Sequence, residues 1–181
     1  MKKVISPQTI LYPAPSVLVS CVSGSGKANI ITLAWVGTVC SEPPMVSISV
    51  RPGRFSYKLI SETKEFVINI PTTDIVDKVE YCGIHSGKDV DKFKETGLTP
   101  MPATKVMVPL IKECPVNIEC KVKDEVHLGS HNLFLGEIVA IDIDEEILTE
   151  EGRINYLKAK PVIYNNGEYW KLGERLPISH R

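Results

Sequence analysis

The sequence predicts a mainly β protein with a few helices, folded as a closed or nearly closed antiparallel barrel. Strand-like runs with alternating or β-branched character recur along the chain and are joined by short hairpin signals. Helical periodicity is confined to a few short stretches. Because closure into a barrel leaves no long edge strand exposed, many hairpin-linked strands favour that architecture.

The first half of the chain supplies four strand signals. The run at 16–23 leads into the turn sequence GSGK, which favours a hairpin. The run at 28–41 is rich in β-branched and aromatic residues and stops at Glu-Pro-Pro. Two further runs, at 45–50 and 65–70, also read as strands.

The second half supplies two hairpins. Apolar residues alternate through 114–128, the pattern of a half-buried strand, and 131–144 is its expected antiparallel partner across a Gly-Ser-His turn. The segment 162–172 is a hairpin around Asn166-Gly167, a strong short-range hairpin signal.

Three stretches favour helices. The segment 54–64 places apolar residues on one side, and 72–87 begins at a Thr or Asp cap and continues in helical register. A short helical turn at 89–97 ends at Gly97.

Length and composition narrow the class of protein. The 181 residues suit one domain, 1–181, that buries a core without metals or disulfides. A net charge of −1 argues against a nucleic-acid surface, and no apolar run reaches membrane-spanning length. The N-terminal stretch lacks the pattern of a signal peptide, so we expect a cytoplasmic protein without a membrane partner.

The five cysteines are irregularly spaced and form no CxxC pair, which argues against disulfides. Cys82 and His85 share one expected helical turn, but two ligands make a poor zinc site, and we expect no metal. Buried thiols acting as small apolar residues are the simpler interpretation. Cys40 lies within the motif region described next, and a redox role for it stays open.

The segment NIITLAWVG contains the first candidate binding residues. On a continuous strand Asn29 and Trp35 share one face, and Thr32 lies on the other. Core filling explains Trp35 equally well, and turn duty is an alternative for Asn29.

The segment SVRPGRFSYKLI places Arg51, Arg54 and Ser56 around the start of an expected helix. A helix N-terminus has free N–H groups and a positive dipole end, so these side chains can hold a phosphate there. Ordinary loop duty is the alternative. Lys92 can reach a phosphate from another side, or it can belong to a solvated lysine face.

The Gly-Ser-His turn raises a separate question, because histidine is not a usual turn residue. Taken alone, His131 is most simply a half-exposed histidine bonded to nearby backbone. A ligand-binding role needs partners from elsewhere in the chain.

Together these motifs resemble a known family. Asn-x-x-Thr-x-x-Trp, then Pro-Pro, then Ser-x-Arg-x-x-Arg-x-Ser, an Asp-Lys-Phe segment, and Gly-Ser-His before LFLGEI follow in order. The chain is similar in this respect to the flavin reductase-like family of FMN-binding split β-barrels, and most of all to its flavoredoxin branch. The resemblance runs from about residue 13 to residue 170.

The resemblance implies a Greek-key split barrel that forms a homodimer with one FMN per subunit near the interface. Asn29, Thr32 and Trp35 would then line the flavin, and Arg51, Ser56 and Lys92 would serve its phosphate. The remaining implied contacts are His131, whose ring can hydrogen-bond the cofactor, and Tyr164, an aromatic wall.

The implied activity is that of an FMN-dependent oxidoreductase that passes electrons through bound FMN. The chain has no GxGxxG motif and no P-loop, so NAD(P)H would have to stack directly on the flavin, or a redox protein would be the donor. The alternative is a split barrel that binds flavin for sensing or storage without turnover. No catalytic residue is predicted.

Overall fold

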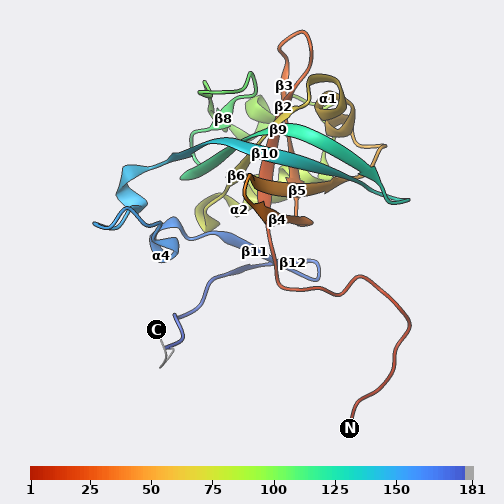
Figure 1. The fold of residues 1–181 in the computed structure, drawn as a ribbon, viewed down its shortest axis with the longest axis vertical. Helices are drawn as coiled ribbons and strands as arrows, with labels where there is room; N and C mark the ends of the chain where they lie inside the picture. Colours follow the sequence, from red (N-terminus) through yellow and green to blue (C-terminus); the bar gives the residue numbers. More distant parts are fainter. Residues whose placement is uncertain (178–181) are drawn as a thin grey trace.

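The computed structural model describes residues 1–177 and shows a seven-stranded antiparallel sheet as the centre of the molecule (Figure 1). The strand order is β3-β2-β6-β9-β10-β5-β4. These strands are β2 (Val17–Val22), β3 (Ala28–Leu33), β4 (Val36–Ser41), β5 (Pro44–Val50), β6 (Glu65–Ile70), β9 (Val116–His127) and β10 (Asn132–Ile143).

The sheet curls into a barrel because its two outermost strands are consecutive in the chain. Only Ala34 and Trp35 separate β3 from β4, and the Ser49 N–H of β5 donates to the carbonyl oxygen of Trp35 at 2.9 Å. The predicted barrel is confirmed. The run 28–41, however, is two strands with a bend between them rather than one.

Smaller elements surround the barrel. Short strands form a three-stranded sheet from β1 (Ala14–Pro15), β11 (Val162–Asn165) and β12 (Glu168–Lys171), and a two-stranded one from β7 (Pro100–Met101) and β8 (Leu110–Ile111). The helices are α1 (Phe55–Thr63), α2 (Val76–Ile84), α3 (Lys92–Thr96) and α4 (Tyr156–Ala159), with single 3₁₀ turns η1 (Thr73–Ile75) and η2 (Glu145–Ile147).

The three predicted helical stretches contain α1, α2 and α3, but α4 and η2 were not anticipated. The helix α4 is one turn long, and the Asn155 side chain caps it by accepting from the N–H groups of Leu157 and Lys158. A single turn shows too little periodicity to be found in a sequence.

Two apolar clusters determine where the helices lie. Inside the barrel, Phe66 and Phe134 pack with Ile48 and the inward residues of β2 and β3. Outside it, Leu18 and Ile30 pack against Val79 and Cys82 of α2 and Phe93 of α3. The strands β2 and β3 are therefore covered on both faces, and α2 and α3 are held against the outer face of β3.

The N-terminal segment lies outside the barrel. Residues 1–11 are exposed and extend away from the barrel as an arm (Figure 1). None of the helices in the described part of the chain has the length and apolar character to cross a bilayer.

Candidate functional site

Two adjoining cavities lie where α1 begins, α2 ends and the chain bends after β3. The smaller has a volume of about 140 Å³ and the larger about 420 Å³. Arg54 and Gly83 line both, so the two cavities share a wall.

Lys92 is the central cation of the small cavity. It is the first residue of α3, only 4% exposed, and its Nζ donates to the carbonyl oxygens of Ile30 and Cys82, each at 2.7 Å. Burial lowers the pKa of Lys92, and the nearby charge of Arg54 lowers it further. An ammonium has three N–H donors, so one remains for an anion in the cavity.

Ser56 also lines the small cavity, and Asn29 holds it from behind. Asn29 is buried on β3, and its Nδ2 donates to the Ser56 Oγ at 2.8 Å in the first turn of α1. Gly87 passes so close that a Cβ there would collide with the Asn29 amide. Asn29 thus positions Ser56, and Ser56, which lines the cavity, keeps its own hydroxyl hydrogen for a ligand.

The arginine at the small cavity is Arg54. It is the N-cap residue of α1, and Gly53, Phe55 and Ser56 beside it also line the cavity, so the helix N-terminus faces the space. Arg51 does not appear in the lining. Its Nε instead donates to the His131 Nε2 at 3.4 Å. Of the two arginines in the motif, Arg54 has the better position for a phosphate.

The larger cavity brings together Thr32, Trp35, His131 and Tyr164. Trp35 lies in the bend after β3, is 40% exposed, and packs on the His131 ring with centroids 4.6 Å apart. It does not share a strand face with Asn29, because β3 ends at Leu33. His131 therefore has a neighbour from elsewhere in the chain, and its ligand-binding role stays a prediction.

The hydrogen bonds of His131 favour its neutral ring. The Nε2 accepts from Arg51, and the Nδ1 lies 2.9 Å from the Ser130 Oγ. Burial lowers the pKa of His131, and the positive charge of Arg51 lowers it further. The fixed positive charge behind the ring therefore belongs to Arg51.

Thr32 and Tyr164 occupy the far walls. The Thr32 Oγ1 donates to the Val79 carbonyl oxygen at 2.5 Å and so ties β3 to α2. Tyr164 lies on β11 and packs edge-to-face between Tyr12 and Tyr169, with centroid distances of 5.8 and 6.0 Å. All three tyrosines line the cavity, which gives it an aromatic side.

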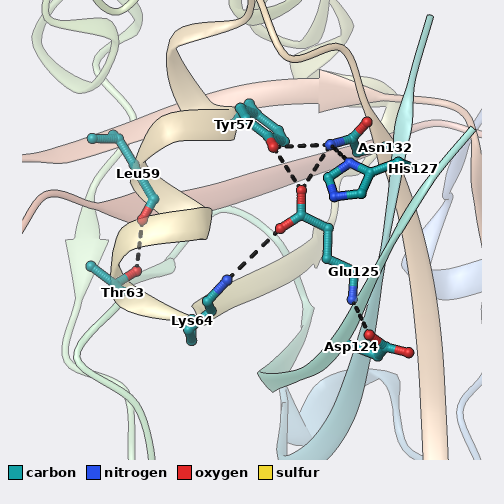
Figure 2. A network of polar contacts seen from close by, with 8 residues as sticks. All are labelled: Tyr57, Leu59, Thr63, Lys64, Asp124, Glu125, His127 and Asn132. Carbon is teal, nitrogen blue, oxygen red and sulfur yellow. Dashed lines mark hydrogen bonds and ion pairs between the residues drawn. The ribbon is translucent and has the colours of Figure 1, made fainter. Parts of the chain in front are cut away.

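A polar network fixes the β9–β10 hairpin to α1 (Figure 2). His131 directly precedes Asn132 of this network in the chain. The Asn132 Nδ2 donates to the Tyr57 hydroxyl at 2.9 Å and to Glu125 Oε1 at 2.8 Å, and the Tyr57 hydroxyl donates to the same oxygen at 2.7 Å. Lys64 adds an ion pair to Glu125. Burial alone would raise the pKa of Glu125, but the hydrogen bonds from Tyr57 and Asn132 hold it below its ordinary value.

Several lining residues were not anticipated from the sequence. Gly83 is in the last turn of α2, and His85, Ser86 and Gly87 come from the connection between α2 and α3; all four line the small cavity. The Gly and Ser content of this connection was the available signal. Glu80 and Ser16 line the larger cavity, but no feature of the sequence marks them, because both lie within ordinary helix and strand patterns.

The cysteines are free thiols, and four of them are buried. Burial raises the pKa of Cys21 and of Cys82 to about 11, and the Cys114 and Cys120 pKa values are raised as well. These four stay protonated and serve as small apolar residues. Cys40 is half-buried on β4, with its Sγ 3.4 Å from the Glu42 carbonyl oxygen.

The structure is a split barrel with a polar cavity and an adjoining aromatic cavity at the start of α1. Residues 10–173 match the flavin reductase like domain, and the chain belongs to that family. It has the split-barrel fold of flavin-binding proteins.

Solved structures and curated relatives agree with this assignment. Flavoredoxin of Desulfovibrio vulgaris (Miyazaki F) is 36% identical, with a TM-score of 0.93 over 99% of this chain and 98% of that one. Flavoredoxin from Methanosarcina acetivorans is 30% identical, with a TM-score of 0.91 over 100% and 97%. A protein of Pyrococcus abyssi is 40% identical over 147 residues, which are 81% of this chain and 83% of that protein.

Proposed function

We propose that this chain is an FMN-dependent oxidoreductase that passes electrons between a donor and an acceptor through bound FMN. The observation that carries the proposal is the small cavity, where the Lys92 ammonium, the Ser56 hydroxyl, Arg54 and the N-terminus of α1 converge. These groups suit a phosphate, and the adjoining aromatic cavity suits a flavin ring.

The residues present fit FMN. A buried lysine with an unused N–H is costly unless an anion partners it, and a phosphate supplies that anion. Riboflavin lacks the phosphate, so FMN is the better match. The similarity to flavoredoxins supports the same choice.

When bound, FMN supplies the electron chemistry, and the protein supplies binding, orientation and electrostatics. Lys92, Arg54 and Ser56 would hold the phosphate, with Asn29 keeping Ser56 in place. Thr32 ties the wall strand to α2, while Trp35 and Tyr164 would pack against the ring. His131, backed by Arg51, would place a positively polarised group at the ring's edge.

The donor is either NAD(P)H or a reduced redox protein. Anaerobic addition of NADH and then NADPH to the purified holoprotein, followed in the visible flavin band, separates these. Rapid bleaching by a nicotinamide supports a reductase, and bleaching only by dithionite or a reduced protein supports an electron carrier. A protein that takes up no FMN would contradict the proposal.

The second candidate is a flavin-binding or sensing module without turnover. The open, half-exposed Trp35 and its neighbours favour access by a second substrate, which a storage module does not need. Bound FMN that neither nicotinamides nor redox proteins reduce would support this alternative.

We further propose a cytoplasmic homodimer whose subunit is one domain over residues 1–181. Irregularly spaced free cysteines suit a reducing compartment. For the dimer, the support is an apolar groove of about 790 Å³ between the N-terminal arm and the bend into β4, together with the exposed arm itself.

A further inference from the structure

Ser16 lies at the wall of the larger cavity, directly before β2. Its backbone N–H donates to the Val162 carbonyl oxygen at 3.1 Å, and the residue is only 1% exposed. Val17 pairs with Leu33, so Ser16 lies beside Ala34 at the bend that also carries Trp35. The backbone of Ser16 is thus fixed on both sides.

The Ser16 hydroxyl is unusual because, among the described residues, no group hydrogen-bonds to it. Buried polar groups in native proteins almost always have a partner, and an unpaired one calls for an explanation. A hydroxyl at a cavity wall can find its partner in a bound ligand, since rotation about one side-chain torsion redirects it.

The larger cavity has both apolar and polar lining residues. Leu33, Ala34 and Ile84 make the nearby lining apolar. Tyr169 lies near Glu80, and burial and that carboxylate both raise the Tyr169 pKa. Among the described residues that line the larger cavity, Ser16 is the one whose hydroxyl is both buried and without a partner, so a flat heteroaromatic ring entering here can supply that partner.

We propose that Ser16 contacts the cofactor and hydrogen-bonds the polar edge of the isoalloxazine ring. The inference rests on the proposed flavin function and adds a ring contact from the residue directly before β2, distant in sequence from the phosphate residues. It assigns Ser16 to ring recognition and Lys92 to phosphate recognition, and the two roles can be measured separately.

The test compares dissociation constants of FMN and riboflavin for three proteins in the absence of nicotinamide. Ser16→Ala should weaken both ligands by the same factor, roughly twofold to tenfold for one neutral hydrogen bond, and leave their ratio unchanged. The matched control is Ser61→Ala. The Ser61 Oγ is also buried without a partner in the described chain, but Ser61 lies on α1 and lines neither cavity. It should bind both ligands like the parent.

Thermal melting of the ligand-free proteins guards against a merely structural effect. Removing an unpaired buried hydroxyl should leave the melting temperature of Ser16→Ala unchanged or raise it. Unchanged flavin affinity in Ser16→Ala would overturn the inference. If the KM for NADH rose in the same variant, the hydroxyl would contact the nicotinamide instead. A parent protein that binds no flavin would instead overturn the proposed function.

Discussion

Lys92 connects burial to a measurable pH dependence. Burial lowers the Lys92 pKa in the free protein below its ordinary 10.5. A bound phosphate dianion favours the charged ammonium and raises that pKa again. Binding FMN therefore requires a proton once the pH exceeds the Lys92 pKa of the free protein.

The expected result is that FMN affinity is full at neutral pH and decreases as the pH rises toward 10.5, with a limiting slope of about tenfold per pH unit. Riboflavin, measured in parallel from pH 7 to 10, corrects for titration of the flavin ring. Lys92→Met should lower the FMN-to-riboflavin affinity ratio and make it independent of pH. A ratio that stays constant in the parent would show that Lys92 does not hold the phosphate.

His131 carries a second prediction at the same scale. Its ring packs on Trp35 and accepts a hydrogen bond from Arg51, so it holds the positive charge of Arg51 beside the cavity. His131→Ala should disfavour the reduced cofactor and lower the two-electron midpoint potential, by roughly 30 mV for each 1.4 kcal/mol of lost differential interaction. Arg51→Gln should shift the potential in the same direction. Potentials equal to that of the parent, with FMN still bound, would leave His131 an ordinary turn residue.

At the scale of elements, the contact between α1 and the β9–β10 hairpin positions His131 relative to the start of α1. Tyr57→Phe removes one hydrogen bond to Glu125 and should lower the free energy of unfolding by about 1 kcal/mol. The melting temperature should fall by about 2–4 °C. Tyr156→Phe is the control, because Tyr156 is 47% exposed.

The pH profile of Tyr57→Phe gives an independent check. The Glu125 pKa is depressed in the folded protein, so its contribution to stability is present above the ordinary pKa of 4.5 and is lost as the pH falls through the folded value. The difference in stability between parent and variant should therefore shrink in acid. If the stability difference stayed the same below the folded-state pKa of Glu125, the Tyr57 hydroxyl would not be stabilising the protein through the Glu125 carboxylate.

The sequence predicts an element well when the residues that determine it are neighbours in the chain. The hairpins at β9–β10 and β11–β12 have local signals, in alternation and in Asn166-Gly167, and both were found. The bend at Ala34–Trp35 has none, since two apolar residues look the same in a strand or between strands. Barrel closure determines it, through β5.

The candidate site follows the same division. Lys92 and Ser56 line the small cavity and Trp35, His131 and Tyr164 the larger one, and their contacts with FMN stay a prediction. Which of Arg51 and Arg54 lies at the small cavity depends on the direction in which the chain enters α1. The sequence does not show this direction, because the two arginines are only three residues apart. Ser16 could not be selected from the sequence, because only the three-dimensional structure shows that its buried hydroxyl lacks a partner.

At the scale of the whole molecule, the N-terminal arm is the feature that a single chain leaves unexplained. Ile10 and Leu11 are 61% and 93% exposed, and the arm points away from the barrel (Figure 1). Beside its base lies the apolar groove lined by Trp35 and Val39, both large and exposed. In the proposed homodimer, the arm and groove of one subunit would be covered by the other.

Replacing Ile10 and Leu11 by serine should therefore weaken dimerisation. Full burial of such a side chain is worth about 1.5–3 kcal/mol, so two of them per arm should raise the dimer dissociation constant by at least a hundredfold. Sedimentation of the holoprotein at micromolar concentration measures this, with the double change Lys2→Ser and Lys3→Ser as the control in the same arm. A monomeric parent would contradict the dimer itself. A parent dimer that the apolar substitutions leave equally tight would confine the interface to the barrel and leave the arm outside it.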